Sequence, residues 1–342
     1  MTYNPALDGL RAFAILVVAL FHAHAPWAQA GYVGVDVFFV LSGYLITSLL
    51  LQEQARTGQV DFLEFWRRRL WRLTPALLAM LLAYVSLGPL LWPDVTNRGM
   101  QAAVAALYLT DYAIALRGLG GQISHTWSLA VELHFYLLWP VVLVPASRRW
   151  TGRALVQVLG AAYLLATLLR WVCTIRGQGW DLVYYRADTH CSGLLLGACL
   201  AVALQDAWWR LALQRALPWL LWIPVAALLC LRYTWGDLWM QMWGLSIAEW
   251  AALVAIVAVQ RPGATLTSMF SRPLLVWLGR ISYGLYLWHY PVFSWLRERY
   301  HWDTVLFVGL PVSVALAATS HYTIETWAAR RRGSRGAAQA AS

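Results

Sequence analysis

"LRAFAILVVALFHAHA", residues 10–25, is the stretch that decides the fold. It is apolar enough to lie in a membrane, yet Arg11 stands near its start and His22 near its end. A charged residue at the centre of a bilayer costs at least ~2.5–3.5 kcal/mol on insertion scales. An apolar helix that keeps both residues, eleven positions apart, indicates a membrane protein with functional groups inside the bilayer.

The composition extends this interpretation to the whole chain. Of its 342 residues, 60% are hydrophobic and 12% are charged, whereas a soluble domain carries about 25% charged residues. So few charges exclude a soluble globular protein, and we expect the lipid bilayer, not nucleic acid, as the partner. All 26 basic side chains are arginines, which can each hold a phosphate through two hydrogen bonds.

Apolar segments recur along the chain and predict an all-α, polytopic helical bundle. Between the second and the third, "FLEFWRRRLWRL", residues 62–73, alternates arginines with large apolar residues, which is typical of an amphipathic interfacial helix. The expected membrane segments are 9–25, 31–51, 73–92, 99–116, 126–145, 154–175, 188–204, 217–233, 239–259, 275–296 and 304–324.

The arginines also predict the orientation, because cytoplasmic loops carry the excess of positive charge. Counting from the arginine-rich loop 52–72 and from the basic end of the chain gives results that differ by one crossing. Segment 99–116, interrupted by Asp111, is therefore expected to be re-entrant. This leaves about ten crossings, both termini in the cytoplasm, a membrane domain over 1–330 and a disordered basic tail over 331–342.

Two segments place polar residues in apolar helices, where they usually mark function. "GYVGVDVFFVLSGYLIT", residues 31–47, contains Asp36, and "HTWSLAVELHFYLLWP", residues 125–140, contains Glu132 four residues after Ser128. Both carboxylates are candidates for acid–base work. The alternatives are a structural partner for a cation at Asp36 and a neutral, hydrogen-bonded Glu132.

Two further segments hold candidates for binding a substrate. Asp188 and His190 open an apolar stretch, and Tyr286 lies one helical turn before His289 in "GRISYGLYLWHYPV", residues 279–292. The alternatives are a helix cap for Asp188 and packed, hydrogen-bonded histidines.

The cytoplasmic arginines are candidates for holding an anionic metabolite. Charge-assisted hydrogen bonds from guanidinium groups suit phosphates, and four arginines lie within about one and a half turns of helix. Anchoring to anionic lipid headgroups is the alternative. The four are Arg67, Arg68, Arg69 and Arg72.

Six motifs in order resemble the acyltransferase-3 membrane family, bacterial O-acyltransferases that acylate carbohydrates and secondary metabolites. "LDGLRAFAILVVALFHA" is similar to its first helix with an arginine and a histidine separated by ten residues, and "RRLWR" to its Arg-Arg-x-x-Arg motif. The others are "GYVGVDVFFVLSGYLIT", "WSLAVELHFYLLWP", "ISYGLYLWHYPV" and the closing "IETWAARR". His134 departs from the family pattern, and the chain looks like the stand-alone form without a fused hydrolase-like domain.

The resemblance implies transfer of an acyl group, most directly acetyl, from cytoplasmic acyl-CoA to a hydroxyl of a carbohydrate, glycolipid or metabolite. His22 would be the catalytic base or the acyl carrier, oriented by Asp36 or Glu132. Arg11 and the four cytoplasmic arginines would bind the donor, and no metal is expected. Asp188, His190, Tyr286 and His289 would line the acceptor side. The location implied is the bacterial cytoplasmic (inner) membrane.

A proton-coupled transporter of a small polar solute is the alternative function, because carriers also hold His, Asp and Glu inside a bundle. The arginine-rich cytoplasmic segment, the motif series and the lack of an inverted repeat favour the acyltransferase.

The predicted topology can be tested by cysteine-accessibility labelling. After replacement of the four native cysteines, single cysteines are introduced at positions 95 and 150. Position 95 should react with a membrane-impermeant reagent from the periplasm, and position 150 only after the membrane is opened. Periplasmic labelling at both positions would show that 99–116 is not re-entrant.

Overall fold

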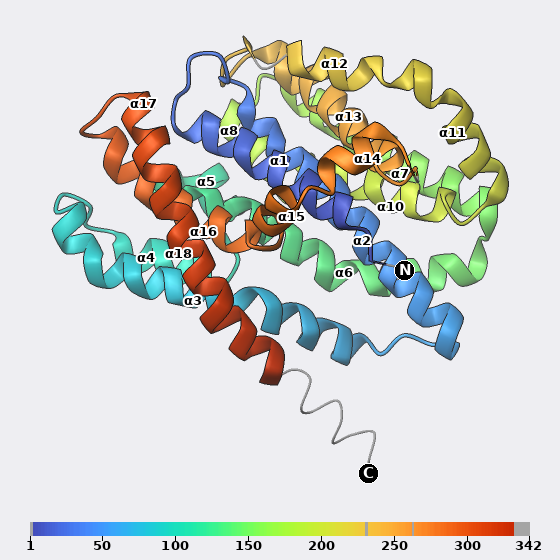
Figure 1. Ribbon diagram of the computed structural model, residues 1–342, viewed down its shortest axis with the longest axis horizontal. Coiled ribbons are helices and arrows are strands. Elements are labelled where there is room, and N and C mark those ends of the chain that lie inside the picture. Colours follow the sequence, from blue (N-terminus) through green and yellow to red (C-terminus); the bar gives the residue numbers. More distant parts are fainter. Residues whose placement is uncertain (1–2, 230–231, 262, 332–342) are drawn as a thin grey trace. The chain divides into compact units, whose positions relative to one another are not determined.

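The structure is a computed structural model that describes residues 3–229, 232–261 and 263–331 (Figure 1). Every regular element in these ranges is a helix, which confirms the all-α prediction. Seven helices are long and apolar enough to cross a membrane, and a bent pair of helices raises this number to eight. Nearly all of the predicted disordered tail, 332–342, lies outside the described residues.

The helical membrane bundle is thus confirmed, while the number of crossings stays a prediction. The expected crossings 188–204, 217–233 and 275–296 fall on helices shorter than 18 residues. A straight helix needs about 20 residues to span a bilayer.

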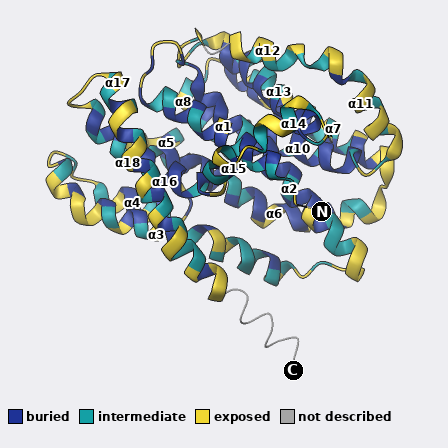
Figure 2. Cartoon of the chain, viewed as in Figure 1, coloured by how far each residue is buried: buried dark blue, intermediate teal, exposed yellow. Residues whose placement is uncertain are grey.

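The chain divides into two compact units, 1–60 with 131–280 (unit 1) and 61–130 with 281–342 (unit 2). In unit 1, α2 is the most buried candidate span. It packs against α1, α10 and α13, whereas α11 and α12 are largely exposed (Figure 2). The helices of unit 1 are α1 (Pro5–His22), η1 (Gly31–Val33), α2 (Gly34–Thr57), α6 (Trp127–Arg149, which begins in unit 2), α7 (Gly152–Ile175), α8 (Trp180–Tyr184), α9 (Ala187–His190), α10 (Ser192–Ala203), α11 (Ala207–Leu220), α12 (Trp222–Leu229), η4 (Met240–Gly244), α13 (Leu245–Ala258), α14 (Thr265–Phe270) and α15 (Pro273–Arg280).

Glycines bring α2 into backbone contact with its neighbours. A Cβ atom on Gly34 would lie 2.6 Å from the carbonyl oxygen of Ala14 in α1, and one on Gly43 would overlap the backbone of Leu194 in α10. Small residues let membrane helices approach closely. Gly34 and Gly43 therefore permit the close packing of α2 against α1 and α10.

In unit 2, α16 packs against α3, α18 and η2. The expected interfacial helix 62–73 and span 73–92 form one continuous helix, α3, of 30 residues. At ~1.5 Å per residue it is about 45 Å long and exceeds the ~30 Å hydrocarbon core, so its arginine-rich first turns can still lie at the interface. The helices of unit 2 are α3 (Phe62–Leu91), α4 (Arg98–Ala106), α5 (Thr110–Arg117), η2 (Gly121–Thr126), α16 (Ser282–Arg297), α17 (Trp302–Thr304), η5 (Val305–Gly309), α18 (Leu310–Ser320) and η6 (His321–Glu325).

The segment expected to be re-entrant consists of α4 and α5, with nine and eight residues. Tyr108, between them, has a positive φ of 56°, which interrupts the helix. Neither helix is long enough to cross a membrane.

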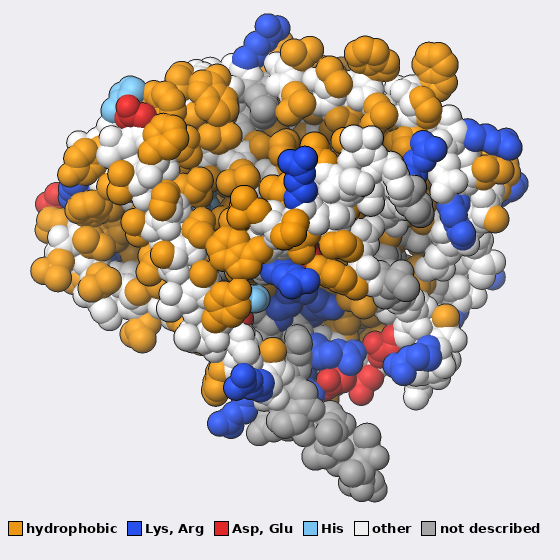
Figure 3. Space-filling model, viewed as in Figure 1, with side chains coloured by type: hydrophobic (Ala, Val, Ile, Leu, Met, Phe, Trp, Pro, Cys, Tyr) orange, Lys and Arg blue, Asp and Glu red, His pale blue; other side chains and the backbone are white. Residues whose placement is uncertain are grey.

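Apolar side chains cover wide areas of the face in Figure 3, as expected of a surface that faces lipid.

The α2–α10 crossing should be sensitive to a single methyl group. Gly43→Ala should lower the unfolding temperature of the protein in detergent, because overpacking typically costs about 1–3 kcal/mol. Gly160→Ala is the matched control, since nothing lies within 4 Å of a Cβ atom on that α7 glycine. Equal unfolding temperatures for the two variants would contradict the close approach at Gly43.

Candidate functional site

Arg11 and His22 lie on one face of α1. The helix is capped by the side chain of Asn4, which accepts a hydrogen bond from the backbone N–H of Ala6 at 3.0 Å, and Pro5 opens its first turn. Because α1 runs unbroken, the step of eleven positions from Arg11 to His22 makes about three turns and a rise of about 16 Å. Both side chains are half-buried. α1 therefore carries a cationic group in its second turn and an imidazole at its last residue.

His22 is the last residue of α1 and lies at the edge of a group of aromatic side chains. Its ring contacts that of Phe21, with centroids 5.0 Å apart. The Phe21 ring also contacts those of Tyr32, at 5.2 Å, and Trp235, at 5.8 Å. His22 is thus next to a surface that can hold the flat face of a ligand.

Asp36 pairs with His190. Nε2 of His190 lies 3.0 Å from Oδ1 of Asp36, and both side chains are fully buried. Oδ2 of Asp36 has no hydrogen-bond partner among the described residues. The carboxylate–imidazole pair that the structure forms is therefore Asp36–His190, and an orienting role of Asp36 toward His22 stays a prediction.

The hydrogen bonds of His190 fix the protons of this pair. Nδ1 of His190 lies 2.5 Å from the carbonyl oxygen of Tyr184, and a carbonyl only accepts, so Nδ1 carries a proton. The contact with Asp36 needs one more proton, either on Nε2 or on the carboxylate. The pair is electrically neutral in both cases, as its burial requires.

Glu132 is held by two hydroxyl groups. Ser42 donates to Oε1 of Glu132 at 2.5 Å, and Tyr136 donates to the same oxygen. A carboxylate oxygen is suited to accept hydrogen bonds from hydroxyl groups in this way. Ser128, one turn earlier in the chain, has a different partner from Glu132. Its hydroxyl lies 2.7 Å from that of Tyr286.

Arg170, in the C-terminal part of α7, was not among the residues singled out from the sequence. It is fully buried and lies 3.3 Å from Oε1 of Glu249, and it donates to Ser192 at 2.9 Å and to Ser246 at 2.6 Å. The same reasoning that selected Arg11, a cation in an apolar segment, would have found it. Arg170 fixes α10 at Ser192, two residues after His190.

Asp188 has a different environment from His190. It forms an ion pair with Arg186, with Arg186 Nε 2.9 Å from its Oδ1, and its side chain is 40% exposed. The two residues therefore differ in burial and in their partners, and their shared place on the acceptor side stays a prediction.

In unit 2, Tyr286 and His289 lie with His125, a residue that was not predicted. The ring centroids of the two histidines are 5.8 Å apart, and the Tyr286 hydroxyl donates to the carbonyl of His125 at 2.7 Å. Nε2 of His125 is 3.2 Å from the carbonyl oxygen of Leu287 and must donate to it. Nδ1 of His125 then keeps a lone pair, which has no partner in the described part of the chain.

The predicted donor-binding arginines differ in their local contacts. Arg67 Nε lies 2.6 Å from Glu64 of the same helix, and Arg68 lies 3.8 Å from that carboxylate. Arg69 lies over the ring of Phe65, with 5.4 Å to its centroid, and Arg72 is exposed. Arg67 is thus partly neutralised within α3, and Arg72 is the most accessible of the four.

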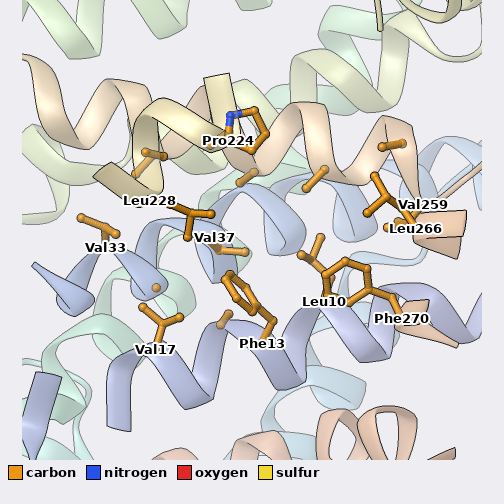
Figure 4. Close-up of a pocket in the computed structure, with 18 of the residues that line it drawn as sticks. Leu10, Phe13, Val17, Val33, Val37, Pro224, Leu228, Val259, Leu266 and Phe270 are labelled. Carbon is orange, nitrogen blue, oxygen red and sulfur yellow. The ribbon is translucent and has the colours of Figure 1, made fainter. Parts of the chain in front are cut away.

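A cavity of about 300 Å³ lies in unit 1 beside α1 (Figure 4). Leu10, Phe13 and Val17 line it from α1, on a different face from Arg11 and His22, and every other lining residue is also apolar. The cavity fits hydrocarbon. It offers no hydrogen-bonding side chain to a pantetheine arm, which stays predicted for the Arg11–His22 face. Within the described ranges, no group of three or more His, Cys, Asp or Glu could hold a metal ion.

Residues 4–321 match the family model described as an acyltransferase domain. The chain belongs to the acyltransferase-3 family. This membership confirms the resemblance recognised from the motifs.

Relatives named as O-acetyltransferases cover the same region. The O-acetyltransferase OatA of Staphylococcus aureus strain COL is 33% identical over 353 residues, and a putative O-acetyltransferase of strain MSSA476 is 32% identical over 350 residues. Each alignment covers 95% of this chain, and the chain spans 57% of the length of each relative. No solved structure matches.

The pairing of Arg170 with Glu249 gives a stability prediction. Arg170→Met leaves a buried carboxylate without its cation, which typically costs about 3–5 kcal/mol. The variant should lose most of its monodisperse fraction in size-exclusion chromatography in detergent, and Arg170→Met with Glu249→Gln should recover most of it. A single Arg170→Met variant as stable as the wild type would show that the ion pair does not hold unit 1 together.

Proposed function

We propose that this membrane acyltransferase moves an acyl group, most directly acetyl, from cytoplasmic acyl-CoA to a hydroxyl of a carbohydrate, glycolipid or secondary metabolite. The observation that carries the proposal is the placement of Arg11 and His22 on one face of a single membrane helix in a member of this family. The names of the relatives support acetyl as the group transferred. The proposed location is the bacterial inner membrane, with both termini in the cytoplasm.

On the donor side, the proposal uses the cationic side chains. Acyl-CoA is anionic, and Arg68, Arg69 and Arg72, with Arg67 beside Glu64, would hold its phosphates through charge-assisted hydrogen bonds. Arg11 would bind the donor at the start of α1. The rise of about 16 Å along the helix suits a long, thin pantetheine arm that brings the thioester to His22.

Two chemical roles of His22 are open. As a general base, it takes the proton of the acceptor hydroxyl, whose oxygen attacks the thioester carbonyl; the C–S bond breaks and the proton passes to the CoA thiolate. As a nucleophile, its ring nitrogen first attacks the thioester carbonyl, and the C–S bond breaks to release the thiolate. The acceptor hydroxyl then attacks the acyl-histidine, the C–N bond breaks, and the hydroxyl proton passes to the thiolate. Glu132 or Asp36 would orient the imidazole, and Asp188, His190, Tyr286 and His289 would contact the acceptor.

His22→Gln tests the proposal. Glutamine keeps the size and hydrogen-bonding capacity but removes the proton acceptor, so transfer and hydrolysis of radiolabelled acetyl-CoA by the purified protein should fall about 10²–10⁴-fold. His24→Asn is the control: His24 is exposed at a positive φ of 62°, which asparagine tolerates. If His22→Gln keeps more than a tenth of wild-type turnover, the catalytic role belongs to His289 or Glu132 instead.

A second experiment separates the two roles of His22. Quenching the enzyme after incubation with the donor alone should trap acyl-histidine only if His22 is an acyl carrier.

A further inference from the structure

The apolar cavity of unit 1 follows a row of small side chains along α13. Alanines recur there at the spacing of one helical face, and the ten positions that they span make a rise of about 15 Å at ~1.5 Å per residue. Half of the ~30 Å hydrocarbon core of a bilayer has the same thickness. The cavity is thus about as long as the acyl chains of one leaflet. The alanines are Ala248, Ala251, Ala252, Ala255 and Ala258.

The size and lining of this cavity favour an apolar occupant. Protein interiors contain few voids larger than a water molecule, whereas this cavity has a volume of about 300 Å³. An engineered apolar cavity of about 150 Å³ excludes water and binds benzene. An elongated apolar cavity of twice that volume, in a membrane protein, suits a hydrocarbon chain.

One wall of the cavity lies at the surface of unit 1. Pro224, Ala227 and Leu228 of α12 line it, and every residue of α12 is exposed or half-buried (Figure 2). This helix packs against α13. Because α12 covers the cavity from the outside, a chain from the surrounding bilayer can reach it along the edge of α12 without passing through the interior of the unit.

The two ends of the cavity differ in their surroundings. Figure 4 shows Val259, Leu266 and Phe270 together at one end and Val33 and Leu228 at the other. The first three residues belong to the last part of α13, its following residue and α14, next to the basic connection 261–272. Positive charge predicts that this connection is cytoplasmic.

Two arginines stand beside the α14 end of the cavity. Arg261 lies two positions after Val259, and its carbonyl accepts a hydrogen bond from the Thr267 hydroxyl at 2.7 Å, which joins this turn to α14. Arg272 lies two positions after Phe270. Both arginine side chains are exposed, so they can bind a group at the membrane surface.

An apolar channel with cationic groups at one end matches an anionic phospholipid. Guanidinium groups hold phosphate through paired hydrogen bonds, and the anionic lipids of the cytoplasmic leaflet attract basic segments near the membrane. The length of the cavity matches the acyl chain, and the charge at its end matches the headgroup. A free fatty chain or a detergent tail would leave the arginines without a counterpart.

We propose that this cavity binds one acyl chain of an anionic phospholipid of the cytoplasmic leaflet, whose phosphate is held by Arg261 and Arg272. The chain fills the space between α1, α2, α12 and α13 and stabilises their packing. This inference goes beyond the proposed acyl transfer and does not depend on it.

Native mass spectrometry of the purified protein tests the site. After delipidation in detergent, added dimyristoyl phosphatidylglycerol should bind at one copy per chain, at least fivefold more tightly than dimyristoyl phosphatidylcholine. The unfolding temperature should rise with phosphatidylglycerol concentration, because a ligand that binds the folded state stabilises it. Equal affinities for the two lipids would overturn the proposal.

Filling the cavity should abolish the site without unfolding the protein. Ala251→Leu with Ala255→Leu adds side chains that project into the empty space, so phosphatidylglycerol binding should weaken at least tenfold while the unfolding temperature of the lipid-free protein does not fall. The matched control is Ala161→Leu with Ala226→Leu, because both alanines are exposed and lie outside the lining. Wild-type affinity in the filled variant would show that the lipid binds elsewhere.

The headgroup contact is tested by Arg261→Gln with Arg272→Gln. Affinity for phosphatidylglycerol should fall at least fivefold, and affinity for phosphatidylcholine should change less. Arg148→Gln with Arg149→Gln removes the same charge from two exposed arginines at the end of α6. Equal losses in the two double variants would contradict a specific contact with Arg261 and Arg272.

A donor acyl chain is the other occupant that the experiment can detect. Transfer of a myristoyl group from its CoA thioester by the wild type, lost in the filled variant, would assign the cavity to the donor and overturn the lipid site. Loss of phosphatidylglycerol binding in the filled variant, with acetyl-CoA turnover retained, is the expected result.

Discussion

Unit 1 depends on the neutralisation of charges that cannot reach water. Arg170 pairs with Glu249, and Asp36 shares a proton with His190, all four being fully buried. Each pair is neutral as a unit, which is what permits burial, because an isolated charge in this environment would cost several kcal/mol. The pairs join α2, α7, α9 and α13, so the helices that carry the candidate site are fixed by the same contacts that hide its charges.

The close approach of helix backbones makes those pairs geometrically possible. Gly34 lets α2 lie against α1, and Gly43 lets α10 lie against α2. Residues that hydrogen-bond across such crossings need backbones closer than larger side chains would allow. Asp36, between the two glycines, thereby reaches His190, the last residue of α9, at 3.0 Å.

The half-buried groups differ from these pairs in what they can do. Arg170 and Glu249 are enclosed, and their ion pair explains their presence in apolar helices without any ligand. Arg11, in the second turn of α1, and His22, its last residue, are half-buried. The Phe21 ring contacts that of His22, and the rings of Tyr32 and Trp235 pack on Phe21.

The sequence by itself determined what depends on local pattern. Low charge and long apolar segments specified a helical membrane protein, the spacing of Arg11 and His22 placed them on one face of a helix, and motifs in order specified the family. The sequence predicted a separate interfacial helix over 62–73, whereas α3 continues without a break from Phe62 past Pro75.

Only the tertiary structure decided which polar residues meet. Asp36 and His190 are 154 positions apart, and Arg170 and Glu249 are 79 apart. No periodicity links such positions, since helical spacing predicts neighbours only three or four residues away. The rings of Phe21, Tyr32 and Trp235 come from three separate segments for the same reason. Helix packing determines these partners, because each buried charge or ring needs a complementary group on another helix.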